Sequence, residues 1–411
     1  MRQIILFTRK YPYGFHETFL AAELEYLAEK FDRILIVPNQ SAPDMRDVSK
    51  NVMVDTRLTL KEMGKFRYIV KAIFTISFNL FFKEISQHSK YFLSPKALWR
   101  ILMNLEEASR VQRYLNRLKR KCELESGGTI LYTYWLGGQS LGVSLFKEKN
   151  PDQLFVSRVH RGDLYEESHQ LPYLPFRKEI YHNIDKVFLI SQDGFDYLQT
   201  KFPEMQIPAE IARLGVPDPG FTAVASADGV LRIVSCSTLK DIKRVDLLIA
   251  GLSEFSRLYP DQSVEWNHLG SGPLHEHLVQ LAGEILDESI NWCFHGQMPQ
   301  EQVIGFYRKN PIDLLINVSS SEGIPVSIME AQSCGIPVIA TAVGGTPEIV
   351  NNHNGILLPA DPSPVEIAQA IQSINLALDL KKNNSKKQWE EIYHARDNYQ
   401  RFVNSLYSLF D

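Results

Sequence analysis

The chain has 411 residues, which is more than one hydrophobic core normally serves and predicts two domains or three. Its formal net charge is -4, so a nucleic-acid partner is not expected. The four cysteines (Cys122, Cys236, Cys293 and Cys334) are scattered, which favours reduced thiols in the cytosol over a zinc site or a disulfide framework.

The amino-terminal residues predict a strand, a helix and a second strand. Apolar runs at residues 4–8 and 33–37 indicate buried strands, and apolar residues at helical spacing indicate a helix over residues 17–31. A strand, a helix and a parallel strand in this order imply a doubly wound sheet, in which ligands bind at the carboxyl ends of the strands. The loop after the first strand should therefore face a ligand with Gly14 and Thr18, although Thr18 would also serve as a helix cap.

Residues 61–121 are predicted to be mostly helical, and they are rich in aromatic and basic side chains. A helical face of this composition can lie in a membrane interface, but it more often packs against a sheet. No apolar stretch reaches the ~20 residues that would span a bilayer, and no signal peptide is apparent. The expected location is the cytoplasm, with attachment to the inner face of the cytoplasmic membrane through residues 61–121 as a further hypothesis.

The first predicted domain is completed by three more buried strands, at residues 129–135, 155–159 and 186–191. The second of these strands runs directly into a polar segment that contains His160, Arg161 and Asp163. A stretch rich in proline, glycine and small polar residues over 217–229 then indicates a linker between domains.

The carboxyl-terminal half alternates strands and helices without interruption, which is the pattern of a Rossmann-like domain. Its strands are predicted at residues 231–236, 264–269, 291–295, 312–318, 337–341 and 356–358. Its helices are predicted at residues 245–258, 274–285, 300–309 and 364–378, and an amphipathic helix over residues 387–410 follows. The expected fold class is therefore α/β, with two doubly wound parallel sheets.

The most informative stretch follows the strand at residues 312–318. Glu322 lies in the loop at the carboxyl end of that strand, and Glu330 lies on the helix that should begin at Pro325. The free N–H groups and the positive dipole end of this helix suit a phosphate. Two carboxylates beside an anion site are explained if the ligand also carries hydroxyl groups, and a nucleotide sugar carries both. As an isolated pair, the two glutamates would instead be read as solvated side chains.

Two connected patterns in this region carry a family resemblance. S-x-x-E-G-x-P-x-x-x-x-E-A spans residues 319–331, and G-x-P-V-I-A-T-x-x-G-G-x-x-E-I-V spans residues 335–350. Together they resemble the donor-site signature of the family-four retaining glycosyltransferases of the GT-B fold. The resemblance implies two Rossmann-like domains that face a cleft. It places an acceptor-binding domain at residues 1–220, with a helix at 390–411 packed back on it, and a domain that binds the nucleotide sugar at residues 221–389.

The resemblance also assigns roles to donor-site residues. Lys243 corresponds to the lysine that binds the donor phosphates, and Thr238 stands where the family usually has an arginine. We expect Arg244 to supply the missing charge, because it is adjacent to Lys243 and the rest of the site is intact. An unreplaced charge-assisted donor would cost ~1.5–3 kcal/mol. Glu322 would bind hydroxyls of the donor sugar, and Glu330 those of the ribose. The backbone would contact the phosphates at Gly323, Ile324, Pro325 and Val326, Gly296 would face the base, and a side chain would block the nucleotide at Gly270 and Gly272.

On the acceptor side, two segments resemble those of transferases that build extracellular polysaccharide. One is the P…ETF…E pattern over residues 12–23, and the other is the H-x-x-D-x-Y segment over residues 160–165. His160 would donate a hydrogen bond to sugar hydroxyls; alternatively, it caps Asp163 or the following turn. The residues expected to bind the acceptor are Gly14, Thr18, Arg161 and Asp163, and His160 is counted as catalytic.

The resemblance therefore implies a retaining glycosyltransferase. It would move a hexosyl unit from a nucleoside diphosphate sugar to a saccharide or lipid-linked saccharide acceptor, in capsule or exopolysaccharide biosynthesis. The chain has no Asp-x-Asp pair, so no metal and no other cofactor is expected. The alternatives are a catalytically weak subunit that binds sugar nucleotides, and an epimerase or phosphorylase of the same fold. An NAD-dependent oxidoreductase is disfavoured because Gly270 and Gly272 are not followed by the third glycine of G-x-G-x-x-G.

Overall fold

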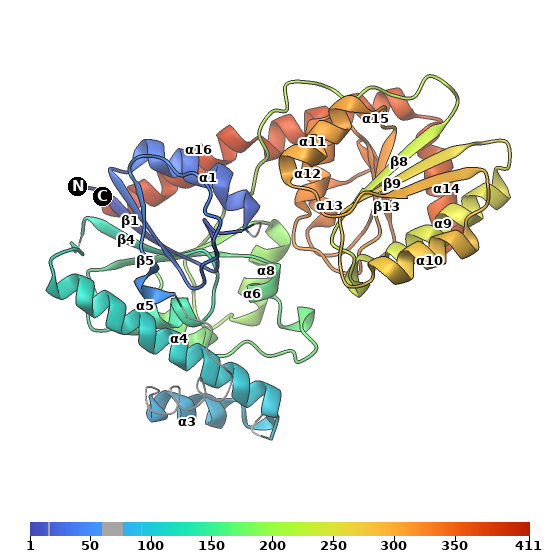
Figure 1. Ribbon diagram of the computed structural model, residues 1–411. Coiled ribbons are helices and arrows are strands. Elements are labelled where there is room, and N and C mark those ends of the chain that lie inside the picture. Colours follow the sequence, from blue (N-terminus) through green and yellow to red (C-terminus); the bar gives the residue numbers. More distant parts are fainter. Residues whose placement is uncertain (15–16, 60–76, 92, 126) are drawn as a thin grey trace. The chain divides into compact units, whose positions relative to one another are not determined.

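The computed structural model describes residues 1–14, 17–59, 77–91, 93–125 and 127–411 (Figure 1). These residues form two compact units, one made of Met1–Ala212 and Tyr399–Asp411 and the other of Arg213–Asn398. Residues 213–220, which the sequence assigned to the first domain, belong to the second unit. In the described ranges no helix is both long and apolar enough to cross a membrane.

The first unit is built on a parallel sheet of seven strands in the order β3-β2-β1-β4-β5-β6-β7. The strands are β1 (Gln3–Thr8), β2 (Arg33–Pro38), β3 (Val52–Val54), β4 (Thr129–Thr133), β5 (Leu154–Val159), β6 (Lys186–Leu189) and β7 (Ala209–Ile211). Strands β2 and β3 lie on one side of β1, and strands β4 to β7 lie on its other side. The order therefore reverses between β1 and β4, and doubly wound folds bind ligands beyond the carboxyl ends of strands at such a switch point.

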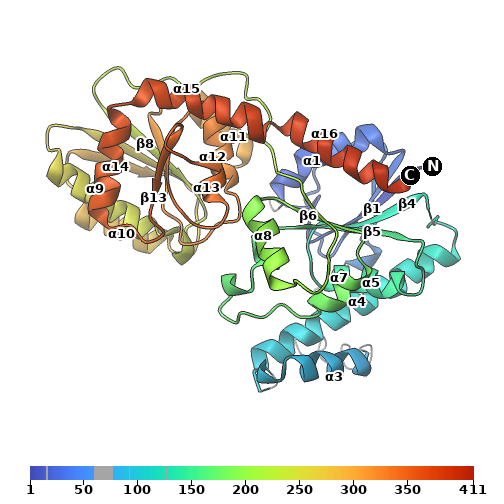
Figure 2. The same cartoon turned by 180° about the vertical axis from the view of Figure 1, so that it is seen from behind.

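Helices cover both faces of this sheet because its strands are apolar on both sides. They are α1 (Thr18–Lys30), α3 (Phe78–Gln87), α4 (Pro95–Arg120), α5 (Gly138–Lys147), α6 (Arg161–Leu164), α7 (Arg177–Asn183), α8 (Gln192–Lys201) and α16 (Ala395–Tyr407). Along β1, Ile5 and Phe7 join one core with residues of α4 and α5. Ile4 and Leu6 point to the other face and join a second core with α1 and α16, which lie side by side in Figure 2. This alternation is the period of two that a strand imposes.

The second unit has a parallel sheet of six strands in the order β10-β9-β8-β11-β12-β13. The strands are β8 (Leu231–Cys236), β9 (Val264–Leu269), β10 (Ile290–Phe294), β11 (Leu314–Asn317), β12 (Val338–Thr341) and β13 (Gly355–Leu358). The helices are α9 (Val245–Leu258), α10 (His275–Ile285), α11 (Gln300–Lys309), α12 (Val326–Ser333), α13 (Thr346–Ile349), α14 (Pro364–Asn375) and α15 (Leu378–Gln388). The strand order reverses between β8 and β11, so the carboxyl ends of these two strands form the switch point of this unit. The predicted class, α/β with two doubly wound parallel sheets, is confirmed.

The single helix expected over residues 387–410 is wrong. The chain forms α15, a π-helical turn at Trp389–Tyr393, and then α16. The break occurs at His394, because Val216 forms a strand-like bridge there: its N–H donates to the carbonyl of Tyr393 at 3.0 Å, and its carbonyl accepts from the N–H of Ala395 at 3.1 Å. Helix α15 was not predicted because its sequence is polar around almost the whole circumference.

Candidate functional site

The candidate donor site lies at the switch point of the second unit. The loop after β8 and the loop after β11 are joined there by a backbone hydrogen bond from Ser320 N to the carbonyl of Ile242, at 2.8 Å. Lys243 Nζ forms an ion pair with Glu322 Oε1 at 2.5 Å, and Asn317 Nδ2 donates to the same oxygen at 3.3 Å. Both charged side chains are largely buried, which strengthens their attraction relative to a surface pair. The fold thus brings together two residues that the sequence assigned to this site.

Arg244 is next to Lys243, but its guanidinium contacts the backbone. It donates to the carbonyls of Val318 at 2.7 Å, Ser319 at 3.2 Å and Ala360 at 2.8 Å, and it pairs with the exposed Asp361. Its own backbone is left-handed, with φ at +48°. These bonds fasten the loop that carries Lys243 to the ends of β11 and β13. In this arrangement the guanidinium is bonded to backbone carbonyls and Asp361, and the expectation that Arg244 replaces a phosphate-binding cation stays a prediction.

Helix α12 begins at the same edge of the sheet, at Val326 with Pro325 as its cap, one residue later than the sequence predicted. Glu330 lies on this helix and is buried, and burial raises the pKa of its carboxyl from 4.5 to about 7; a hydrogen bond from Gln300 of α11 acts in the opposite direction. Lys243 and Glu330 both act electrostatically on the thiol of Cys236, at the end of β8. Ribose-type hydroxyls would satisfy such a buried carboxylate.

Two pairs of glycines hold loops together beside this site. A Cβ on Gly270 would lie 1.9 Å from the carbonyl oxygen of Ser237, and one on Gly272 would lie 2.4 Å from that of Leu239. These glycines were expected to leave room for the nucleotide, whereas in the structure it is the backbone after β8 that leaves no room for a side chain. Gly270 also donates its N–H to the carbonyl of Gly296 at 2.9 Å.

The second pair supports the loop that carries Glu322. A Cβ on Gly344 would lie 2.0 Å from the carbonyl oxygen of Glu322, and one on Gly345 would lie 2.6 Å from that of Gly323. The N–H of Gly345 also donates to the carbonyl of Gly323 at 2.8 Å. The G-G of the second sequence pattern therefore supports the first pattern by close backbone approach, a role that the sequence did not reveal. Residues 323–325 lie just before α12 and Val326 is its first residue. Thr238 is exposed in the loop after β8.

A buried polar network connects the end of β9 to the end of β8 and the loop after it. The sequence analysis did not predict this network. His268, at the end of β9, has Nδ1 2.8 Å from Ser235 Oγ and Nε2 3.1 Å from the carbonyl oxygen of Ser237. Burial lowers the pKa of His268 to about 4, so the ring is neutral at physiological pH. The only feature of the sequence that pointed to His268 was its position two residues before Gly270, in the loop assigned to the donor site.

The candidate acceptor residues lie at the carboxyl edge of the first unit's sheet. His160 follows β5 and is buried against the rings of Trp135 at 4.5 Å, Tyr134 at 4.8 Å and Phe19 at 5.5 Å between centroids. Neither ring nitrogen has a hydrogen-bond partner in the described part of the chain. Burial, together with nearby Arg158, lowers the pKa of His160 well below its usual range, so the imidazole is neutral.

Asp163 has a structural role, but the ring of His160 does not cap it, as the alternative interpretation of this segment expected. Its carboxylate accepts from the backbone N–H of His160 at 2.7 Å and from that of Leu136 at 2.6 Å, so it ties the loop after β5 to the loop after β4. Burial raises the pKa of Asp163 to about 7, against the opposing effect of these hydrogen bonds. Here Asp163 caps the turn that begins at His160, and Arg161 is the first residue of α6.

The remaining predicted acceptor residues are Gly14, in the loop after β1, and Thr18, at the start of α1. Gly14 has a left-handed φ of +64° and donates its N–H to the carbonyl of Asp44 at 3.2 Å. Glycine adopts this conformation without steric cost. Thr18 is the first residue of α1, and its side chain lies outside the described residues.

Comparison with known proteins identifies part of the chain. Residues 231–375 match the model of the family described as Glycosyl transferases group 1. The second unit is a group 1 glycosyltransferase domain. Over 177 residues the chain is 27% identical to the D-inositol 3-phosphate glycosyltransferase of Corynebacterium jeikeium, a match that covers 42% of this chain and 41% of that relative. Over 195 residues it is 31% identical to the amylovoran biosynthesis glycosyltransferase AmsK of Erwinia amylovora, covering 44% of this chain and 45% of the relative.

The family resemblance drawn from the two sequence patterns is thus confirmed. The chain matches less than half the length of these two curated relatives. A solved structure of Anabaena Alr3699/HepE in complex with UDP and glucose covers 98% of this chain and 99% of its own, with a TM-score of 0.66 at 15% identity. That likeness extends beyond the group 1 domain to both units, and it shows the GT-B type of fold.

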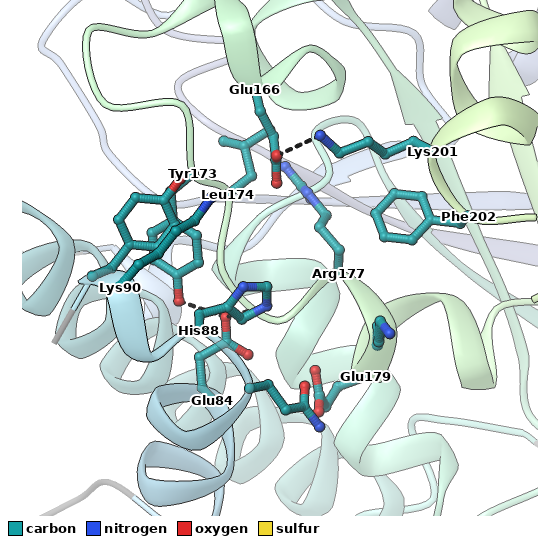
Figure 3. Close-up of a pocket in the computed structure, with 13 residues that line it drawn as sticks. Glu84, His88, Lys90, Glu166, Tyr173, Leu174, Arg177, Glu179, Lys201 and Phe202 are labelled. Atoms are coloured by element: carbon teal, nitrogen blue, oxygen red, sulfur yellow. Dashed lines mark hydrogen bonds and ion pairs between the residues drawn. The ribbon is translucent and has the colours of Figure 1, made fainter.

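A cavity of about 230 Å³ lies elsewhere in the first unit, between α3, α7, α8 and the segment of residues 166–174 (Figure 3). Its charged side chains pair with protein groups: Lys201 with Glu166 at 2.8 Å, and Glu84 with the hydroxyl of Tyr173 at 2.5 Å. None of the predicted site residues lines this cavity. In the described part of the chain no cluster of three or more His, Cys, Asp or Glu side chains could hold a metal ion.

Proposed function

We propose that this protein is a glycosyltransferase that moves a hexosyl unit from a nucleoside diphosphate sugar to a saccharide or lipid-linked saccharide acceptor in polysaccharide biosynthesis. The observation that carries the proposal is the Lys243–Glu322 ion pair at the switch point of a group 1 domain, beside the start of α12. The names of two compared proteins support the substrate classes: AmsK is named for amylovoran biosynthesis, and HepE is described with UDP and glucose.

The chemistry follows from what a departing diphosphate requires. Negative charge grows on the diphosphate as the glycosidic bond breaks, and fixed cations and N–H groups stabilise it. Lys243 would exchange part of its contact with Glu322 for the phosphates, and the start of α12 would add its free N–H groups and its dipole. Glu322 would then bind hydroxyls of the donor sugar. Glu330, whose pKa is raised by burial, would bind the ribose hydroxyls.

The proposed reaction retains the configuration at the anomeric carbon and uses no metal or other cofactor. Lys243 and the helix start would carry the charge that a divalent ion neutralises in metal-dependent transferases. On the acceptor side, the two unpartnered nitrogens of neutral His160 could exchange hydrogen bonds with sugar hydroxyls. The proposed domain roles follow: acceptor binding by residues 1–220 with the helix at 390–411, and donor binding by residues 221–389.

We further propose that the protein works in the cytoplasm, at the inner face of the cytoplasmic membrane when its acceptor is lipid-linked. Helix α3 and the segment after it support this, because Phe78, Phe82 and Leu93 are exposed and Lys83 and Lys90 are basic neighbours. Such a combination suits an interface between lipid headgroups and water. The rest of the stretch at residues 61–121 includes residues 61–76 and 92, which lie outside the described residues.

The decisive experiment has two stages. A panel of nucleotide sugars is first screened by thermal shift, since a ligand that binds only the folded state raises its stability as occupancy grows. Nucleotide release with saccharide acceptors is then measured for the wild type, for Lys243→Ala and for Lys240→Ala, an exposed lysine in the same loop. Loss of one charge-assisted donor worth ~1.5–3 kcal/mol should lower the turnover of Lys243→Ala by about 10- to 150-fold. Lys240→Ala should retain activity, and equal activity of both variants would contradict the role of Lys243.

A sugar-nucleotide-binding subunit is the second candidate. The contacts of Arg244 with backbone carbonyls favour it, because they leave the position of Thr238 without an evident replacement cation. Tight nucleotide-sugar binding without turnover, at any saccharide acceptor, would support this candidate over the transferase.

A further inference from the structure

Glu17 lies where the two loops at the switch point of the first unit meet. Its carboxylate accepts hydrogen bonds from three consecutive backbone N–H groups after β1: Arg9 at 3.1 Å, Lys10 at 2.8 Å and Tyr11 at 2.7 Å. The indole Nε1–H of Trp135, in the loop after β4, donates to the same carboxylate at 2.5 Å. One side chain therefore connects the loops that follow β1 and β4, beyond the carboxyl ends of these strands, where a doubly wound fold binds its ligand.

The local structure around Glu17 is unfavourable in itself. The residue is only 7% exposed, and its φ of +56° is in the left-handed region that side chains rarely adopt. Such strain persists only where surrounding contacts over-determine it, and it is concentrated at functional sites. Burial of the carboxylate is tolerated because four donors satisfy it. Three of these bonds hold the carboxylate against the loop after β1, and the fourth holds the indole of Trp135 against the carboxylate.

The indole that Glu17 holds forms one wall around His160. The centroid of Trp135 lies 4.5 Å from that of the imidazole, closer than the rings of Tyr134 and Phe19. His160 is 6% exposed, and its two nitrogens have no hydrogen-bond partner in the described chain. A buried polar ring without partners is costly, so a ligand hydroxyl that supplies one is favoured. The orientation of the ring then decides whether that hydroxyl can reach a nitrogen.

We propose that Glu17 is a positioning residue of the acceptor site: through the indole N–H of Trp135 it sets the orientation of His160 toward a hydroxyl of a saccharide acceptor. This inference rests on the proposed function, which supplies the saccharide hydroxyl. If Glu17 only organised the loop after β1, the backbone bonds to Arg9, Lys10 and Tyr11 would suffice, and the indole N–H would be dispensable. Trp135→Phe separates the two cases, because it keeps an aromatic ring beside His160 and removes the N–H.

The test combines a substrate-free measurement with kinetics on the full-length protein. Tryptophan carrying ¹⁵N in the indole and histidine carrying ¹³C in the ring report on Trp135 and His160, with Trp135→Phe and His160→Gln used to assign the signals. Glu17→Gln should move both signals, whereas Glu29→Gln, which changes an exposed carboxylate on α1, the helix that Glu17 precedes, should move neither. In sugar transfer, Glu17→Gln and Trp135→Phe should each lower kcat by about tenfold or more with the KM for the nucleotide sugar unchanged. The double variant should lose no more than either single one, since both act on one ring.

Three results would overturn the inference. The His160 signal could stay in place in Glu17→Gln, Trp135→Phe could retain full kcat while Glu17→Gln does not, or the losses of the two variants could multiply. The failure of the proposed function looks different: the wild type would then transfer no sugar from any nucleotide sugar, while the magnetic resonance measurement, which needs no substrate, would still decide whether Glu17 controls the rings of Trp135 and His160. An unchanged KM for the nucleotide sugar would also show that the variants do not act through donor binding by the group 1 domain.

Discussion

Replacing Arg244 tests whether this residue binds a phosphate or holds a loop. Its guanidinium donates to the carbonyls of Val318, Ser319 and Ala360 at 2.7–3.2 Å. At about 1 kcal/mol net for each of these partly exposed bonds, removing the side chain should destabilise the second unit by about 2–3 kcal/mol. The ion pair with Asp361 adds little, because that carboxylate is almost fully exposed.

The backbone conformation of Arg244 lowers the stability of the second unit, whereas the hydrogen bonds of its side chain raise it. A φ of +48° costs a non-glycine residue about 1 kcal/mol, and glycine adopts it without that cost. Arg244→Gly should therefore be less destabilised than Arg244→Ala by about 1 kcal/mol. In a unit of this size the difference corresponds to about 2–4 °C in Tm, which thermal unfolding followed by circular dichroism can resolve.

Activity then separates the two roles of the guanidinium. If it holds the loop of Lys243, both variants lose stability and turnover together, and Arg244→Lys resembles Arg244→Ala because a lysine cannot form the fork of bonds to several carbonyls. The reasoning is refuted if Arg244→Ala unfolds like the wild type, Arg244→Lys keeps nearly full activity, and only the affinity for the nucleotide sugar falls. In that case the residue supplies charge to the diphosphate, as the sequence suggested.

Two further predictions concern the second unit. Burial raises the pKa of Glu330 from 4.5 to about 7. The protonated carboxyl therefore contributes to stability at low pH, and this contribution is lost as the pH rises from 4.5 to about 7. The loss amounts to up to about 3 kcal/mol in the free energy of unfolding. Glu330→Gln should remove this part of the pH dependence in urea unfolding between pH 4.5 and about pH 7. Gly270→Ala should destabilise the unit by about 2 kcal/mol or more, since its Cβ would lie 1.9 Å from a backbone oxygen at a φ of +141°. Gly305→Ala, in open space on α11, is the matched control and should stabilise by about 0.5–1 kcal/mol.

Each of these predictions has an outcome that would contradict it. An unchanged slope of stability against pH in Glu330→Gln would mean that this carboxyl is ionised in the folded protein over the whole range. Equal stability of Gly270→Ala and Gly305→Ala would mean that the loop after β9 can move away from the loop after β8 at little cost.

Most of the fold could be predicted because it follows from local patterns. Runs of four to six apolar residues predicted most strands, and Pro325 predicted the start of α12. The misses have physical reasons. Helix α15 is polar around its circumference, and the break at His394 is imposed by Val216, which is far away in sequence. The short edge strands β3 and β7 have only three residues each and give too weak a periodic signal.

The residues of the candidate donor site could be predicted from the sequence, but the contacts between them could not. Lys243, Glu322 and Glu330 were named from a motif, and two of them are in contact. The sequence did not show that the side chain of Arg244 points away from that of Lys243. This difference in direction follows from the left-handed backbone of Arg244 just before α9. The sequence did not show the contacts of Glu17 either, since its four donors come from two loops.

By itself, the sequence determined the alternation of strands and helices and the motif of the group 1 domain, because each of these features depends on residues that are close together in the sequence. The tertiary structure decided which of the charged residues meet. Lys243 and Glu322 are 79 positions apart, and Glu17 and Trp135 are 118 apart. Such pairs form only because the strand order reverses between β8 and β11 and between β1 and β4, which brings the carboxyl ends of distant strands side by side.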